Sequence, residues 1–244
     1  MNELGPERSR GAARTFCEST LAAMTAEDRI AWALETLPGQ HIVSSSFGAQ
    51  SALMLHLVTR AKPGIPVVLI DTGYLFPETY QYIDQLTEQL SLNLKVFSSS
   101  RSPAWQEARE GRRWEQGVDG ISAYNHENKV QPMERALQEL DVSTWFAGLR
   151  RSQSSSRGRT PLIESSGEQW KVHPVVDWSD RDVYRYMKQH RLPYHPLWEK
   201  GFVSIGDTHT TRSLNDVSST EELRFFGLTR ECGLHEMSFG KSGS

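Results

Sequence analysis

The stretch from His41 to Ala61, "HIVSSSFGAQSALMLHLVTRA", decides the fold class of this chain. Its first part, "HIVSSS", is typical of a short buried strand, and "FGAQSALMLHLVTRA" has the apolar spacing of a helix. A strand that runs through small residues directly into a helix is the usual beginning of a βαβ unit. We therefore expect an α/β fold built around a parallel sheet.

The same alternation continues along the chain. We predict further strands over residues 66–71, 92–98, 144–149 and 171–178, and helices over residues 25–37, 77–90, 132–141 and 179–192. Strands that alternate with helices predict a mainly parallel sheet with helices on both faces. We expect a loose N-terminal segment over residues 1–20, an α/β domain over 21–206 and a flexible C-terminal tail over 207–244, where the periodic pattern ends.

Bulk composition excludes several classes of protein. The chain has 244 residues, of which 37% are hydrophobic and 23% are charged, and its net charge is −3. This charge argues against bulk attraction to nucleic acid. Apolar runs such as "IPVVLI" are too short to cross a membrane, and the N-terminus has no signal-peptide core. Two cysteines are too few for a disulfide scaffold or a cysteine metal cage, so we expect a cytoplasmic protein.

Loops that follow predicted strands are the places to look for a ligand site, because parallel sheets bind ligands beyond the carboxyl ends of their strands. The loop "SSSFGAQS", residues 44–51, offers hydroxyl groups and backbone N–H groups at a helix start, which can hold an anion. It lacks the "GK[ST]" of a Walker A loop, and an ordinary serine-rich turn would look the same. In "DTGYLFPET", residues 71–79, Asp71 can hold a ribose hydroxyl or a metal, or it can cap the next helix. The loop "SSSRSPAW", residues 98–105, follows the third predicted strand.

Two further segments carry positive charge near these loops. Residues 148–159, "GLRRSQSSSRGR", place four arginines among serines, the residue types that recognise phosphate and sulfate. A solvated basic loop is the alternative. Lys129 lies just before the predicted helix at 132–141, where a lone lysine is usually a surface charge.

Cys232, in "RECGLHEM" near the end of the chain, is the candidate nucleophile. A cysteine reacts as its thiolate, which nearby cations favour. Arg230 and His235 supply positive charge while two neighbouring glutamates oppose it, so the sequence leaves the pKa of the thiol open. A buried structural cysteine is the alternative, but the polar setting favours a reactive thiol. Cys17 has no comparable context, and we expect it to be inert.

Taken together, these segments resemble the assimilatory phosphoadenylyl-sulfate (PAPS) reductases. The resemblance runs in order from roughly residue 27 to residue 237. It is carried by "SSSFG", "DTGYLFPETY", "KVQPMERAL", "WFAGLRRSQSSSR", "YHPLWEKGFVSIGDTHTTR" and "ECGLH".

The resemblance implies a Rossmann-like adenine-nucleotide α-hydrolase fold and a reaction. The reaction is reduction of PAPS to sulfite and adenosine 3′,5′-bisphosphate, with thioredoxin or glutaredoxin as reductant and a cysteine S-sulfonate intermediate. It also implies a homodimer without a bound cofactor. The implied catalytic residues are Cys232, Lys129 and His235, and the implied substrate-binding residues are Ser44, Ser45, Ser46, Phe47, Gly48, Asp71, Thr72, Gly73, Arg150, Arg151, Arg157, Arg212 and Arg224.

One departure within the wider family bears on the subtype. Adenylyl-sulfate (APS) reductases hold a four-iron cluster with two cysteine pairs, and the corresponding positions here are Tyr124, Asn125, Asp207 and Thr210. The resemblance therefore implies the cluster-free branch, with no metal. The chain has no "CxxC" motif of a fused thioredoxin domain, so the reductant is expected to be a separate protein.

Three alternatives stay open at this point. The first is a cluster-free APS reductase or an enzyme that uses both nucleotides. The second is an ATP pyrophosphatase or a sulfate adenylyltransferase subunit of the same fold, against which the loop "SSSFGAQS" lacks paired glycines and an aspartate. The third is a non-catalytic nucleotide-binding module that senses sulfur status and has no need of Cys232.

Overall fold

A computed structural model describes residues 18–166 and 169–228. The helices are α2 (Ala26–Thr36), α3 (Ala52–Ala61), α4 (Pro77–Leu90), α5 (Pro103–Glu110), α6 (Gly117–Asn125), α7 (Gln131–Glu139) and α8 (Asp180–Gln189), with a π-helical turn, η2 (His126–Val130), between α6 and α7. The strands are β1 (Gln40–Ser44), β2 (Pro66–Ile70), β3 (Asn93–Phe97), β4 (Val142–Ala147), β5 (Ile163–Ser166) and β6 (Gln169–Val172). Among the helices of these residues, none is both long and apolar enough to cross a membrane.

The strands form one sheet in the order β3-β2-β1-β4-β6-β5. All neighbouring strands are parallel except β5, which pairs antiparallel with β6 at one edge. β2 and β3 lie on one side of β1, and β4 lies on the other side. The loops after the parallel strands β1 and β4 therefore lie next to each other at the same end of the sheet. This is the place where open α/β sheets bind ligands.

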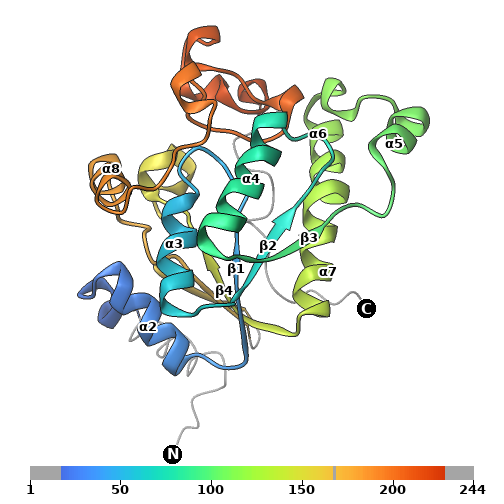
Figure 1. Ribbon diagram of the computed structural model, residues 1–244. Helices are drawn as coiled ribbons and strands as arrows, with labels where there is room; N and C mark the ends of the chain where they lie inside the picture. Colours follow the sequence, from blue (N-terminus) through green and yellow to red (C-terminus); the bar gives the residue numbers. More distant parts are fainter. Residues whose placement is uncertain (1–17, 167–168, 229–244) are drawn as a thin grey trace, which may run out of the picture.

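Both faces of the sheet are covered by helices, as the sequence predicted. Figure 1 shows α3 and α4 side by side in front of the sheet. Val43 and Phe146 pack on the side of α3 and α4, whereas their strand neighbours Ile42 and Trp145 pack on the side of α7. Successive side chains of a strand point to opposite faces, so a strand buried on both faces must be apolar throughout.

The helix starts predicted at Thr25, Pro77 and Ser179 are confirmed, whereas the helix predicted from Phe47 begins only at Ala52. The side chain of Thr25 accepts a hydrogen bond from the backbone of Asp28 at the start of α2, and Ser179 forms a reciprocal capping box with Asp182 at the start of α8. Pro77 occupies the first turn of α4, where its missing N–H leaves no helical hydrogen bond unmade.

The predicted fifth strand is too long. It ends at Val172, and residues 174–177 form a turn, because Pro174 has no N–H to donate to a sheet ladder. The antiparallel strand β5 and the helices α5 and α6 were not predicted. All three are short; β5 and α5 have polar sequences, and α6 contains two glycines, so apolar spacing gives little signal for them.

The first part of the C-terminal segment packs against the sheet domain. Asp207 pairs with Leu75 through the backbone, and Thr211 pairs with Arg224. Leu223 and Phe225 are buried. Residues 207–225 are therefore held by specific contacts instead of forming a loose tail from residue 207 onward, while residues 229–244 and 1–17 lie outside the described part of the chain.

Arg29 joins α2 to the turn that follows β6. Its guanidinium donates to both carboxylate oxygens of Asp177 at 2.7 Å and to the carbonyl oxygens of Leu21 and Pro174. The Arg29 side chain is 4% exposed and the Asp177 side chain 40% exposed. The hydrogen bond from Arg29 lowers the pKa of Asp177, so the carboxylate is stabilised in its charged form.

Arg29→Met should lower the free energy of unfolding by about 3 kcal/mol, the low end for breaking a buried ion pair, because Asp177 is partly exposed. A carboxylate with a lowered folded pKa contributes stability above its unfolded pKa of about 3.9 and loses it as the pH falls. The difference between variant and wild type in urea unfolding should therefore narrow below about pH 4. Arg60→Met, on an exposed position of α3, is the control, and equal losses for both variants would contradict the prediction.

Candidate active site

A cavity of about 870 Å³ lies at the carboxyl ends of β1, β2 and β4. Its walls come from the last residues of these strands, the loops that follow them, the π turn η2 and the C-terminal segment. Of the residues expected to form a site, the cavity is lined by Ser44, Ser45, Ser46, Gly48, Thr72, Lys129, Arg150, Arg157 and Arg224. One depression thus gathers serines, a lysine and arginines from loops far apart in the sequence.

Two serine side chains of the loop after β1 accept hydrogen bonds that help to fix it. The indole Nε1 of Trp145 on β4 donates to Ser44 Oγ at 2.6 Å, and the backbone N–H of Phe47 donates to Ser45 Oγ at 3.0 Å. Phe47 has a positive φ of 49° and is fully buried in the core. Phe47 therefore shapes and anchors the loop from below and does not line the cavity, although we expected it to bind substrate.

Thr72, in the loop after β2, lines the cavity, whereas its neighbours Asp71 and Gly73 stabilise the backbone turn of the loop. Asp71 Oδ1 accepts hydrogen bonds from the Gly73 N–H and the Tyr80 hydroxyl, both at 2.8 Å. Gly73 has a φ of +75°, and a Cβ there would lie 2.6 Å from the Cγ of Pro103. Asp71 and Gly73 thus form a turn and are not part of the cavity wall, and Asp71 does not cap α4, whose N-cap residue is Phe76.

A buried ion pair lies in the cavity wall between Lys129 and Asp207. The Lys129 Nζ is 2.7 Å from Asp207 Oδ2, and the Thr72 hydroxyl donates to Asp207 Oδ1 at 2.6 Å. The side chain of Lys129 is 8% exposed and that of Asp207 is 1% exposed. Burial by itself disfavours the carboxylate, but attraction to Lys129 and the hydrogen bonds hold the pKa of Asp207 well below its usual range. Lys129 is thus a buried charge with a fixed partner and not the usual surface lysine.

Aromatic rings surround this ion pair. The Lys129 Nζ lies 5.3 Å from the centre of the Tyr124 ring and 5.0 Å from that of Phe225. His209 stacks on Trp114 with ring centres 3.7 Å apart, and burial lowers the pKa of His209 to about 4, so the imidazole is neutral at pH 7. A lysine close to ring faces gains cation–π stabilisation, which is larger when the ammonium is shielded from solvent.

Arg212 lies outside the main cavity. It lines a second depression of about 560 Å³ with residues of the aromatic group, among them Trp114 and His209. The structure therefore does not bring Arg212 together with the serine loop, in contrast to the sequence prediction.

The arginines of the loop after β4 differ in their surroundings. Arg150 is buried and donates to Asp180, Gln50 and Ser152 at 2.8, 2.7 and 3.0 Å, so its guanidinium holds the cavity wall together. Arg151 donates to the Thr160 carbonyl and is not part of the cavity lining.

Two other arginines face the same cavity. Arg157 donates to Gln153 Oε1 at 2.7 Å. The Arg224 guanidinium packs directly on Gly206, where a Cβ would overlap its nitrogens. A side chain at position 206 would therefore displace the Arg224 guanidinium.

Cys232 and His235, the expected nucleophile and its neighbour, lie outside the described residues, as does Cys17. Asp207 and Trp145 are the functional candidates that the sequence did not reveal. Asp207 was considered only as a position where relatives have a cysteine, and nothing in "GDTHT" signals its burial. Within residues 18–166 and 169–228, no group of three or more histidine, cysteine, aspartate or glutamate side chains is arranged to hold a metal ion.

Residues 40–213 match the sequence model of the phosphoadenosine phosphosulfate reductase domain. The chain belongs to the phosphoadenosine phosphosulfate reductase family. It is 58% identical over 238 residues to the phosphoadenosine 5′-phosphosulfate reductase of Yersinia enterocolitica, which covers 97% of this chain and 98% of the relative. It is also 58% identical to the Salmonella typhi protein of the same name over 97% of the chain and 96% of the relative. The predicted family of oxidoreductases is thereby confirmed.

Solved structures agree with this assignment. The phosphate complex of a PAPS reductase from Candida auris superposes with a TM-score of 0.72 at 26% identity, covering 86% of this chain and 99% of that one. An FMN adenylyltransferase from Candida glabrata shares the fold alone, with a TM-score of 0.55 at 15% identity over 91% of this chain and 82% of that one. The predicted Rossmann-like adenine-nucleotide α-hydrolase fold is therefore confirmed.

Asp207→Asn should lower the free energy of unfolding by about 3 kcal/mol, because it leaves the buried Lys129 ammonium without a carboxylate. Urea unfolding measures the loss. The control is Asp84→Asn on the exposed side of α4, which should stay within about 0.5 kcal/mol of wild type. Equal stability of Asp207→Asn and Asp84→Asn would show that the ion pair does not hold the C-terminal segment.

Proposed function

We propose that this chain reduces 3′-phosphoadenylyl sulfate to sulfite and adenosine 3′,5′-bisphosphate, with reduced thioredoxin or glutaredoxin as the electron donor. The observation that carries the proposal is the cavity at the strand ends, which brings Lys129 and Arg224 to the serine loop. Relatives that are 58% identical over nearly the whole chain bear the name of this activity. We further propose that the enzyme acts in the cytoplasm as a homodimer in sulfate assimilation.

The chemistry of the cavity suits a nucleotide that carries several anionic groups. Serine hydroxyls and backbone N–H groups between a strand and a helix bind phosphate, and Arg157 and Arg224 add positive charge. A cavity of about 870 Å³ is within the range of pockets for ligands of nucleotide size. The apolar residues of the lining, such as Leu53, Met54 and Leu149, provide a surface for a base.

In the first step the thiolate of Cys232 attacks the sulfur of the sulfonyl group. A new S–S bond forms, and the bond from that sulfur to the nucleotide phosphate oxygen breaks, so adenosine 3′,5′-bisphosphate leaves with the electron pair. The enzyme then carries a cysteine S-sulfonate. A thiolate of thioredoxin attacks Cys232 Sγ, sulfite leaves with the electrons of the S–S bond, and the second thiol of thioredoxin resolves the mixed disulfide.

We propose that Lys129 screens this first step. The thiolate and the sulfonyl group are both negatively charged, so their approach needs a nearby cation. An ammonium has three N–H donors, and Lys129 Nζ forms an ion pair with Asp207 Oδ2 at 2.7 Å while the side chain lines the cavity. We propose that another N–H of Lys129 binds a sulfonyl oxygen. His235 is proposed to favour the thiolate of Cys232.

The position of Cys232 in the chain is compatible with this role. Phe225 lines the cavity, and Cys232 follows it by seven residues. A chain of that length spans at most about 25 Å when extended. The nucleophile is therefore tied by a short segment to the wall of the cavity that it is proposed to enter.

We propose that the enzyme works without an iron–sulfur cluster. The side chains at the four positions where APS reductases have cysteines are a phenol, an amide, a carboxylate and a hydroxyl, whereas such clusters are held by thiolates. Asp207 is already bonded to Lys129 and Thr72. This donor set favours the PAPS-using branch over the APS-using alternative.

The decisive experiment measures sulfite release with reduced thioredoxin from PAPS and from APS in parallel. Wild type should release sulfite from PAPS and much less from APS. Cys232→Ser should abolish release while nucleotide binding stays nearly intact, because the thiolate is needed for attack and little for affinity. Cys17→Ser is the matched control and should be close to wild type. Sulfite production by Cys232→Ser would refute the mechanism, and a higher rate with APS would refute the substrate assignment.

Lys129→Ala should lower the rate of S-sulfonate formation by on the order of 10²-fold, the scale for removing one preorganised charge-stabilising group. Its affinity for adenosine 3′,5′-bisphosphate should change much less, because that product lacks the sulfonyl group. Single-turnover mass spectrometry of the Cys232 adduct and calorimetry of product binding separate the two effects. A parallel collapse of product affinity would place Lys129 in the nucleotide pocket instead.

A further inference from the structure

Lys129 belongs to a helical rod that contains one irregular turn. α6, η2 and α7 follow one another without a break, and within η2 the Gln131 N–H donates to the His126 carbonyl five residues earlier, which is the π-helical pattern. Pro132 has no N–H, and inside a regular α-helix its ring would clash with the carbonyl four residues back, at Asn128. A wider turn relieves such a clash, and π turns of this kind are frequent at functional sites.

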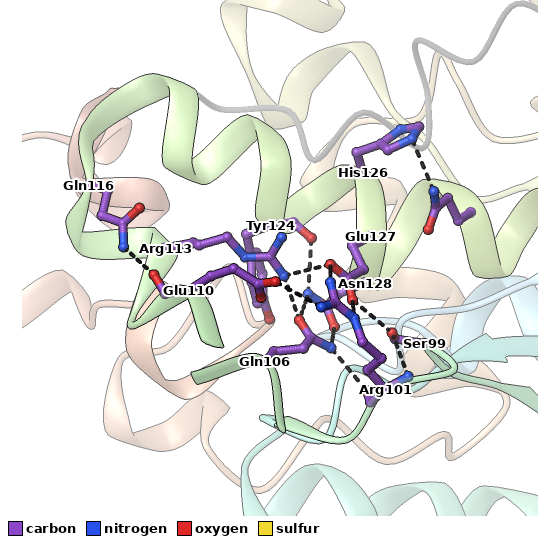
Figure 2. Close-up of polar contacts among 11 residues, drawn as sticks. Ser99, Arg101, Gln106, Glu110, Arg113, Gln116, Tyr124, His126, Glu127 and Asn128 are labelled. Atoms are coloured by element: carbon purple, nitrogen blue, oxygen red, sulfur yellow. Dashed lines mark hydrogen bonds and ion pairs between the residues drawn. The ribbon is translucent and has the colours of Figure 1, made fainter. Parts of the chain in front are cut away.

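A carboxylate on this turn is clamped by two arginines. Glu127 accepts two hydrogen bonds from Arg101, at 2.8 and 2.5 Å, and one from Arg113 at 2.9 Å (Figure 2). The three side chains are only 11–25% exposed. Burial opposes the charged form of Glu127, but the bonds from Arg101 and Arg113 hold its pKa below the usual value. We call Glu127, Arg101 and Arg113 the carboxylate clamp.

Asn128, the residue after Glu127, is held by a pair of hydrogen bonds between amide side chains. Gln106 donates to Asn128 Oδ1 at 2.8 Å, and Asn128 donates back to Gln106 Oε1 at 2.9 Å. Asn128 also donates to the Tyr124 carbonyl, just before the π turn, and Gln106 Oε1 accepts from Arg113 (Figure 2). Asn128 is fully buried. The amide pair and the carboxylate clamp are therefore one network.

This network explains the loop that follows β3. The sequence analysis gave no role to the loop "SSSRSPAW", residues 98–105. None of the residues of this loop lines the cavity. Its Arg101 instead binds Glu127, and Ser102 caps α5, the helix that carries Gln106. The loop and α5 thus bind Glu127 and Asn128 of the π turn, while the next residue, Lys129, lines the cavity.

We propose that Glu127, with Arg101 and Arg113, positions Lys129 for the first chemical step. Glu127 and Asn128 immediately precede Lys129, so the network sets the direction in which the lysine leaves the rod. Asp207 fixes the far end of the same side chain. The inference rests on the role given to Lys129 in the proposed function. Glu127 touches no substrate and acts through Lys129 alone.

The test is the rate of S-sulfonate formation on Cys232 in single turnovers with PAPS, measured by mass spectrometry and corrected for the folded fraction. Glu127→Gln keeps the size of the side chain but removes the charge that holds both arginines. It should lower the rate between about tenfold and 10²-fold, the scale for misplacing a catalytic group by about 1 Å. Affinity for adenosine 3′,5′-bisphosphate should stay within about twofold of wild type. Glu139→Gln is the matched control on the same rod, in an exposed pair with Arg135, and should react like wild type.

A double mutant separates positioning from general stability. If Glu127 acts through Lys129, Glu127→Gln should have almost no further effect in the Lys129→Ala background, because the group to be positioned is gone. A purely structural role predicts the same fold-loss in both backgrounds, and that result would overturn the inference. Arg113→Gln provides a second variant and should behave in the same way.

The outcomes also distinguish this inference from the proposed function. If wild type forms no adduct, the proposed function fails. In a second outcome, wild type forms the Cys232 adduct and Lys129→Ala forms it slowly, but Glu127→Gln forms it at the wild-type rate. Only the positioning inference then fails. A loss of product affinity in Glu127→Gln that matches the loss of rate also overturns it, because the variant then disturbs the whole pocket.

Discussion

The ion pair between Lys129 and Asp207 is the contact on which the rest of the candidate site depends. Two charges at 2.7 Å with almost no exposure are costly to desolvate, and the cost is offset only when both have further partners. Thr72 supplies one such partner, and the rings of Tyr124 and Phe225 lie against the ammonium. The pair thereby ties the loop after β2, the π turn and the C-terminal segment into one wall.

The same contact explains why residues 207–225 are ordered against the domain. Their composition is polar, and polarity alone predicts a loose segment. Asp207 is nevertheless anchored by its side chain and by backbone pairing with Leu75, and the Thr208 N–H donates to the Tyr74 carbonyl at 2.8 Å. Once this point is fixed, Leu223 and Phe225 can bury their side chains nearby. A few buried polar contacts thus replace the apolar pattern that would normally order a segment.

The elements that could be predicted from the sequence are those with a local physical signal. Ser179 and Asp182 predict the start of α8, and the apolar run over residues 66–70 predicts β2. The serine loop and Lys129 were also found as site candidates, with help from the family resemblance. Asp207, Trp145 and the grip of Arg101 on Glu127 were not found, because each is defined by a partner distant in the sequence. Phe47 was assigned to the ligand although it serves the core, since a motif gives positions and not the direction of a side chain.

The π turn has a consequence for how the length of this chain can vary. A π turn has one residue more than the α turn that it replaces, and each residue of an α-helix turns the rod by about 100°. Deleting a single residue from His126–Val130 would let the rod become a regular helix, apart from the kink that Pro132 imposes. The wider turn takes up its extra residue within one revolution, so α6 and α7 would keep nearly the same orientation, but the residues of the turn itself would shift in place. A change in length within this turn would therefore move Glu127 and Asn128 away from the side chains that hold them and would displace Lys129 from Asp207, even though the helices on either side stay in place.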